Sequence, residues 1–123
     1  METVYNWHRS NVPIIRINKY WYNYKSRIIK HFYYKSKKEA MKCALLHEIG
    51  HIKVGYKKNQ AMNEYLAHMW AIKKAKYLKM KTIKKQLEKD ISDWVHFKWN
   101  KEKYGRKYIL ASKIYKKKIN YEQ

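Results

Sequence analysis

The sequence predicts an α+β domain in which a short amino-terminal antiparallel sheet or hairpin is followed by four helices. Two observations indicate this class: residues 1–35 contain short β-branched and aromatic runs, and residues 36–119 contain helix caps and helical periodicity. With 123 residues the chain has the length of one domain, and no Pro/Gly/Ser-rich linker divides it. We therefore expect a single domain over residues 1–123.

In the strand-rich part, the runs that favour strands are "VPIIRI" and "SRIIKHFYY". The polar, tyrosine-rich segment between them, "NKYWYNYKS", suits a hairpin or an exposed edge. Pro13 lacks a backbone N–H, which restricts its segment to a strand start or an edge strand.

The helical part begins with a capping box, because Ser36 and Glu39 can each accept a hydrogen bond from the other's backbone amide. The first helix should therefore run from about Lys37 to Val54, where Gly55 can adopt the left-handed conformation that ends it. Three residues are expected to cap the later helices: Asn59, Thr82 and Asn100. One face of the second helix carries a stripe of residues at helical spacing: Glu64, Ala67, Ala71, Ala75 and Leu78. The residues near the middle of the stripe are small, so another helix could pack closely against them.

The motif "HEIGH" lies in the second half of the first predicted helix. His47 and His51 are one turn apart, so both imidazoles can reach one ion. Glu48 lies about 100° round the helix from His47, where it can hold a water molecule without competing for the metal. This is the arrangement that zinc-dependent hydrolysis requires, with Glu48 as the general base.

A catalytic zinc site needs a third protein ligand. Glu64 is the preferred candidate, since the short segment "GYKKN" lets the second helix return beside His51, and His68 is the alternative on the same face. If Glu64 is the ligand, His68 would lie behind the site or on the substrate side. Cys43 lies one turn before His47, but a buried apolar role is favoured for it over a ligand role.

"HEIGH" followed by "NEYLAHMWA" resembles the glutamate-ligand branch of the zincin metallopeptidases, most closely the small ImmA/IrrE-type and related phage-encoded peptidases. The resemblance covers about a third of the chain and implies a zincin-like domain in which Zn²⁺ is held by His47, His51 and Glu64, with Glu48 as catalytic base. It also implies that a peptide substrate binds along an edge strand, for which "RIIKHFYYK" is the expected segment. The candidates for stabilising the oxyanion are Tyr65, His96 and Tyr104.

The formal net charge is +21, with 30 Lys and Arg against nine acids. The abundant Lys, Ile, Asn and Tyr have AT-rich codons, but codon bias does not explain the shortage of acids. Such a surface attracts polyanions without reading sequence. The candidates for an aromatic–basic binding surface are Tyr20, Trp21, Tyr22, Lys25 and Arg27, and those for further phosphate contacts are Lys73, Lys74, Lys76, Lys84, Lys85 and Lys116 to Lys118. A solvated lysine face over an aromatic core is the favoured interpretation of the same residues.

These observations predict a cytoplasmic zinc metallopeptidase, encoded by a phage or other mobile element, that cleaves a protein such as a regulator bound to nucleic acid. The amino terminus lacks the apolar segment of a secretory signal, and no membrane partner is expected. The alternative is a basic protein that binds nucleic acid or nucleoprotein, for example an inhibitor of a host defence complex, in which the metal is only structural.

Overall fold

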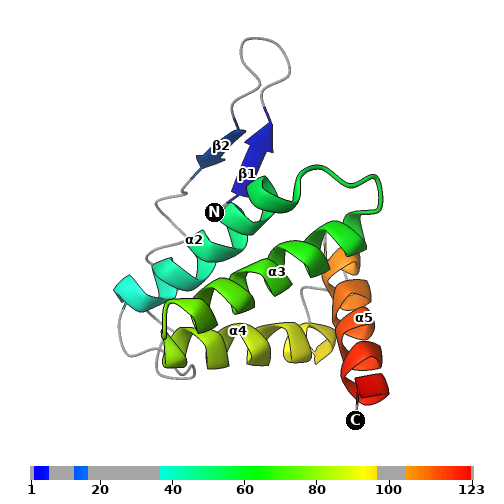
Figure 1. Cartoon of the computed structure of the whole chain (residues 1–123). Helices are drawn as coiled ribbons and strands as arrows, with labels where there is room; N and C mark the ends of the chain where they lie inside the picture. Colours follow the sequence, from blue (N-terminus) through cyan, green and yellow to red (C-terminus); the bar gives the residue numbers. More distant parts are fainter. Residues whose placement is uncertain (1, 6–12, 17–36, 97–104, 123) are drawn as a thin grey trace.

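A computed structural model describes residues 2–5, 13–16, 37–96 and 105–122 of the chain. Within these residues there are two short strands and four α-helices, labelled as in Figure 1. The prediction of four helices is confirmed. The predicted second strand run, "SRIIKHFYY", lies outside the described residues, as do Ser36 and Asn100.

The two strands are β1 (Glu2–Tyr5) and β2 (Pro13–Arg16), which pair antiparallel with Thr3 opposite Ile15. Pro13 is the first residue of β2, as its missing N–H led us to expect. Both strands lie against α2 (Figure 1).

The first of the helices, α2 (Lys37–Val54), has the predicted bounds. Gly55 follows it with a φ of 77°, and its backbone N–H donates to the carbonyl of His51 at 3.1 Å. This left-handed residue satisfies a carbonyl that the end of the helix would otherwise leave without a partner. The predicted end signal is therefore confirmed, and it places the "HEIGH" motif in the last turns of α2.

The next helix, α3 (Gln60–Tyr77), begins at the predicted cap, because the side chain of Asn59 accepts from the backbone N–H of Met62 at 3.1 Å. The small residues of the predicted stripe are fully buried: Ala67, Ala71 and Ala75. Leu78 was wrongly included in that stripe, since the helix ends before it and its side chain is about half exposed.

The end of α3 is a Schellman motif, in which the N–H of Lys79 donates to the carbonyl of Lys76 and the N–H of Met80 donates to that of Ala75. Lys79 occupies the left-handed position with a φ of 58°, and it is the one non-glycine residue with positive φ in the described part of the chain. A side chain in this conformation costs about 1–2 kcal/mol, so glycine or asparagine is the usual choice.

The third helix, α4 (Lys81–Asp93), begins one residue before the predicted cap Thr82. Met80 is the actual N-cap and has no side-chain hydrogen bond, because the Schellman motif at the end of α3 already sets the chain direction. The buried apolar residues of α4 are Ile83, Leu87 and Ile91, spaced one turn apart, and Gln86 is buried beside them. A short 3₁₀ segment, η2 (Trp94–His96), continues from it.

The last helix, α5 (Arg106–Glu122), begins after Gly105 and extends beyond the predicted limit at residue 119. Ala111 and Tyr115 face the common core, and the Ser112 hydroxyl donates to the carbonyl of Ser92. In Figure 1, α3 lies between α2 and α4, and α5 crosses their ends; contacts join α3 to all three. No helix in the described part of the chain is long and apolar enough to span a membrane.

Candidate metal site

The candidate site lies where α2 packs against α3, and Gly50 permits the close approach of these helices. A Cβ atom at Gly50 would lie 2.2 Å from the carbonyl oxygen of Ala67, which is backbone and has little freedom to move. Gly50 directly precedes His51, and Ala67 is three residues after Glu64. The contact therefore brings the two helices together at the level of the predicted ligands.

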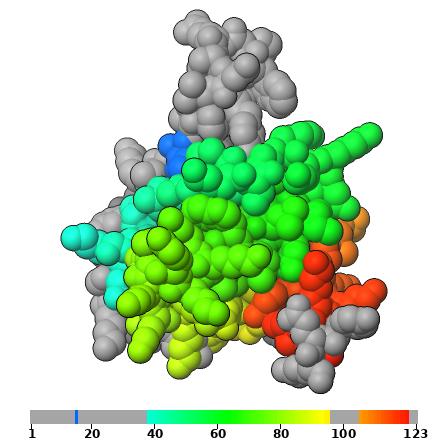
Figure 2. All heavy atoms as spheres, viewed as in Figure 1, coloured from blue at the N-terminus to red at the C-terminus, as the bar shows by residue number. Residues whose placement is uncertain are grey.

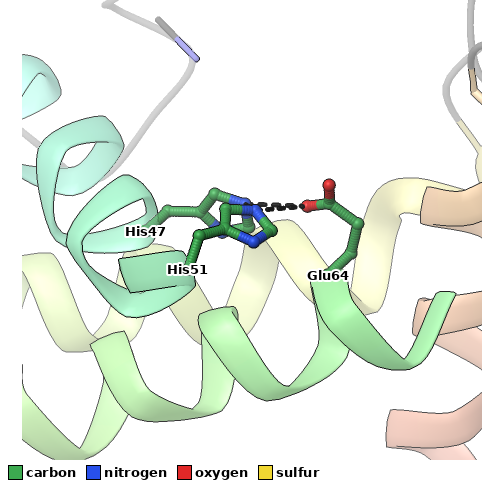
Figure 3. A group of neighbouring side chains, drawn as sticks. All are labelled: His47, His51 and Glu64. Atoms are coloured by element: carbon green, nitrogen blue, oxygen red, sulfur yellow. Dashed lines mark hydrogen bonds and ion pairs between the residues drawn. The ribbon is translucent and has the colours of Figure 1, made fainter. Parts of the chain in front are cut away.

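His47 and His51 extend from α2 and Glu64 from α3, and the three side chains point toward one another (Figure 3). The Nε2 atoms of the two histidines are 3.1 Å apart. The Oε2 atom of Glu64 is 2.9 Å from Nε2 of His47 and 3.2 Å from Nε2 of His51. This group of three ligand atoms could hold a metal ion.

The spacing of the three atoms fits a small divalent ion. A circle through them has a radius of about 1.8 Å, shorter than a zinc–nitrogen bond of about 2.0–2.1 Å, so one ion can lie at bonding distance from all three. Two ligands on bonds of this length are about 2.9 Å apart when they meet the ion at 90°, and about 3.3 Å apart at the tetrahedral angle. The three separations, 2.9, 3.1 and 3.2 Å, fall within this range. Two imidazoles and one carboxylate also form a donor set used by catalytic zinc sites.

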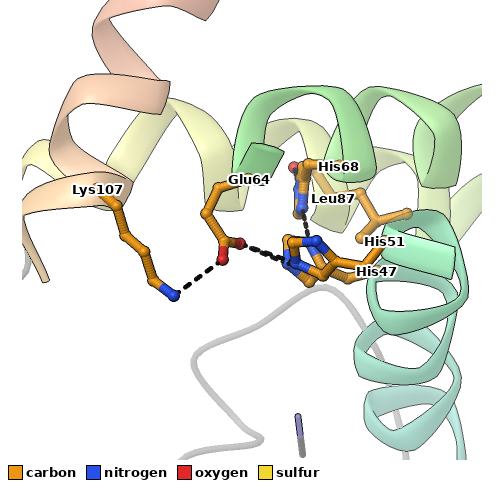
Figure 4. Close-up of polar contacts among 6 residues, drawn as sticks. All are labelled: His47, His51, Glu64, His68, Leu87 and Lys107. Carbon is orange, nitrogen blue, oxygen red and sulfur yellow. Dashed lines mark hydrogen bonds and ion pairs between the residues drawn. The ribbon is translucent and has the colours of Figure 1, made fainter. Parts of the chain in front are cut away.

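A chain of hydrogen bonds behind His47 determines which of its nitrogens is free. The Nε2 atom of His68 lies 2.6 Å from the carbonyl oxygen of Leu87, which can only accept, so that nitrogen carries the proton (Figure 4). Burial lowers the pKa of His68 to about 3, so the ring is neutral and its Nδ1 is an acceptor. Nδ1 of His47, 2.9 Å away, must then donate to it.

When His47 is neutral, this arrangement leaves its Nε2 lone pair directed at the group formed with His51 and Glu64. A lone pair 2.9 Å from a carboxylate oxygen is favourable only with a cation between them, either a proton or a metal ion. The described geometry therefore presents an imidazole that is prepared to bind a metal, and it places His68 behind His47 rather than among the converging atoms.

The electrostatics of the site keep its carboxylate ionised. Burial of Glu64 alone would raise the pKa of its carboxyl. The hydrogen bonds that it shares with His47 and His51, when a proton lies between the groups, outweigh burial and hold that pKa well below its usual value. Burial opposes protonation of His51, yet the hydrogen bond and charge of Glu64 prevail and raise the pKa of His51. The Nζ atom of Lys107, on α5, lies 3.1 Å from the second oxygen of Glu64 (Figure 4).

Two aromatic side chains contribute to the surroundings of the histidines. The centroid of the buried Trp94 ring lies 4.7 Å from that of His68 and 6.1 Å from that of His47. The ring of Tyr108 packs against that of Trp94 in an edge-to-face arrangement, with 5.1 Å between centroids. Burial and the charges of Glu64 and Glu48 raise the pKa of the Tyr108 phenol, so it keeps its proton and can donate a hydrogen bond.

Glu48, the predicted base, is buried on α2 beside His47, and its charge contributes to the raised pKa values of both His51 and Tyr108. It therefore lies in the same electrostatic environment as the group that could hold a metal. Cys43 is buried in the apolar core and is not part of that group.

Another predicted residue, Tyr65, lies away from this group. Tyr65 is buried on α3 and has the Nζ atom of Lys118 over its ring at 5.2 Å, within the contact between α3 and α5. Tyr104 and the side chain of His96 lie outside what the structure describes, as does the predicted aromatic–basic surface: Tyr20, Trp21, Tyr22, Lys25 and Arg27.

Sequence reasoning did not connect Trp94, Lys107 and Tyr108 to this site. They follow Glu64 by 30 residues or more along the chain, and no spacing rule links them to the motif. Tyr108 does fall on a helical repeat, and such periodicity predicts that the side chain is buried. It does not predict which residues that side chain contacts.

No protein-family model matches this chain, and no curated protein or solved structure shows significant similarity to it. The fold and site define a small helical protein with a buried His47, His51 and Glu64 group that could hold a metal ion.

Proposed function

We propose that this protein is a zinc-dependent metallopeptidase that hydrolyses a peptide bond in a protein substrate. The observation that supports it best is the convergence of three ligand atoms from α2 and α3 at separations of 2.9–3.2 Å. The buried Glu48 is close enough for its charge to contribute to the raised pKa of His51. His47, His51 and Glu64 would hold the ion. When bound, zinc would polarise the scissile carbonyl and make water a stronger acid.

Glu48 accepts the proton of the attacking water and passes it to the leaving amine. His47 and His51 project about 40° apart on the helix, whereas Glu48 projects about 100° from His47, so its carboxylate can hold a water molecule without competing for the ion. Tyr108, which keeps its proton, is our candidate for donating a hydrogen bond to the oxygen that becomes negative. It replaces Tyr65, whose ring lies in the contact between α3 and α5.

The resemblance of "HEIGH" and "NEYLAHMWA" to the zincin peptidases supports the same assignment. By analogy with that group, we propose a regulator bound to nucleic acid as the substrate class, which also agrees with the charge of +21.

The test combines metal analysis with a cleavage assay on the full chain. Purified protein would be analysed for zinc, iron and nickel, and then incubated with fluorescently labelled casein and a peptide mixture read by mass spectrometry. Glu48→Gln should retain the metal and lose cleavage by about 100-fold or more, because only the proton acceptor is removed. Tyr108→Phe should likewise retain the metal and cleave more slowly.

Glu64→Ala should lose the metal, whereas Glu39→Gln, the same chemical change as at Glu48 but in the first turn of α2, should leave both properties unchanged. A metal-loaded protein that cleaves neither probe, or that cleaves equally well with Gln at position 48, would contradict the proposal. A metal with four protein ligands would favour the alternative, a basic protein with a structural ion.

A further inference from the structure

The turn between α3 and α4 carries an unusual concentration of positive charge. Between Glu64 and Glu88 the sequence contains no acidic residue. The turn and the adjoining helix ends carry five lysines around one tyrosine, which together we name the α3–α4 knuckle: Lys73, Lys74, Lys76, Tyr77, Lys79 and Lys81. Figure 2 shows the end of α3 and the start of α4 at the surface of the molecule.

The knuckle presents charge and an aromatic ring on the same side of α3. Lys73, Lys76 and Tyr77 lie three and four residues apart, so they share one helical face. The side chain of Tyr77 is 77% exposed, the largest value among the exposed large hydrophobic residues that the structure describes. The Nζ atom of Lys74 lies over one face of its ring at 5.1 Å from the centroid.

None of the five lysines forms an ion pair with any residue that the structure describes. By contrast, Lys84 and Lys89, further along α4, are each paired with an acid one turn later. The charge of the knuckle is therefore not neutralised within the described fold.

Lys79 gives a second, independent observation. It occupies the left-handed position of a Schellman motif, where a side chain is strained and glycine or asparagine is favoured. Codon bias toward A and T does not explain the lysine, because asparagine has equally AT-rich codons and tolerates this conformation better. A strained residue at an exposed turn lowers the stability of the fold, which indicates that its side chain serves another role, such as binding.

We propose that the α3–α4 knuckle binds single-stranded nucleic acid, with lysines on the phosphates and the exposed ring of Tyr77 stacked on an unpaired base. Lysine supplies point charges that follow a backbone without reading its sequence. A tyrosine ring stacks on any base whose face is accessible, which is the case in a single strand and not inside a duplex.

This surface is separate from the metal site. Tyr77 follows Glu64 by thirteen residues on the same helix, which places it about 20 Å along the axis. Substitutions at the knuckle should therefore leave metal content unchanged, and binding of nucleic acid should not depend on Glu48.

The experiment measures fluorescence anisotropy of a labelled 20-nucleotide oligothymidylate, and of the oligouridylate of the same length, with the full chain at several salt concentrations. Tyr77→Ala should weaken binding by about tenfold. The triple change Lys73→Gln, Lys76→Gln, Lys81→Gln should weaken it by about 100-fold at 0.1 M salt, because each lost phosphate contact reduces the slope of log affinity against log salt by about 0.7.

The segment after α2 offers matched controls, because Tyr56 is also exposed and is followed by the exposed Lys57 and Lys58. Tyr56→Ala should have no effect, and Lys38→Gln, Lys57→Gln, Lys58→Gln, with the same change in net charge, should weaken binding by less than tenfold. Lys79→Gly should raise the melting temperature by about 3 °C while weakening binding, so that loss of affinity cannot be attributed to unfolding.

Equal losses in the two triple variants would overturn the proposal, since attraction would then depend on net charge alone. It would also be overturned if Tyr77→Ala bound like the wild type, or if a 20-base-pair duplex, polyglutamate or vesicles containing phosphatidylserine bound as tightly as the single strand. Preference for the single strand that depends on Tyr77 supports it, whichever of the two oligonucleotides binds more tightly.

Discussion

Replacement of Gly50 by alanine tests whether the close approach of α2 and α3 creates the metal site. The new Cβ would lie 2.2 Å from the carbonyl oxygen of Ala67 and 2.9 Å from its carbonyl carbon, so the helices must separate by about 1 Å to restore an ordinary contact. Overpacking of this kind costs about 1–3 kcal/mol. The better helix propensity of alanine offsets about 0.5–1 kcal/mol of that, which leaves a net loss of stability of about 0.5–2 kcal/mol.

The same shift would enlarge the triangle of ligand atoms. The separation of the two histidine nitrogens, 3.1 Å, stays constant because both belong to α2, whereas the distances from Glu64, now 2.9 and 3.2 Å, would grow to about 4 Å. The circle through the three atoms would then have a radius of about 2.2 Å, longer than a zinc–nitrogen bond. One ion could no longer bind all three, so zinc affinity should fall by at least about tenfold.

Zinc affinity would be measured by competition with a chromophoric chelator, and the free energy of unfolding by urea denaturation of the metal-free protein. Gly55→Ala is the matched control, because its φ of 77° strains any side chain while nothing lies within 4 Å of the added Cβ. It should lose about 1 kcal/mol of stability and keep its zinc affinity. If Gly50→Ala bound zinc as tightly as wild type, α2 and α3 would not be held together as the structure shows.

Two further predictions concern the groups behind the histidines. The unfolded chain protonates His68 near pH 6.5, but the buried side chain has a pKa of about 3, so the unfolded state binds the extra proton in this window. As the pH drops from 6.5 toward 3, the free energy of unfolding of the wild type should therefore fall by about 1.4 kcal/mol per pH unit relative to that of His68→Gln. Urea denaturation of both proteins over this pH range measures the difference. If the difference stayed constant, the low pKa of His68 would be refuted. Trp94 lies against the rings of His47 and His68, so Co²⁺ bound at the site should quench the fluorescence of Trp94. In Trp94→Phe most of that quenching should disappear. Quenching that persisted in this variant would place the ion elsewhere.

Features that depend on neighbouring residues were predicted from the sequence. The bounds of α2, its end at Gly55 and the cap at Asn59 follow from hydrogen bonds between residues at most four positions apart. The pairing of His47 with His51 has the same local origin, since one turn of helix brings them together. Thr82 was assigned as a cap wrongly because the Schellman motif around Lys79 determines where α4 begins.

Contacts between distant segments were decided by packing. The sequence left Glu64 and His68 as alternative ligands on one face of α3; the depth at which α2 packs on that helix directs Glu64 to the histidines and His68 to the carbonyl of Leu87. Lys107 was not connected to the site by any pattern, since it reaches Glu64 only through the crossing of α5. The sequence by itself therefore determined the helices and the local motif, because both arise within a few residues, whereas only the tertiary structure decided which other side chains surround the site.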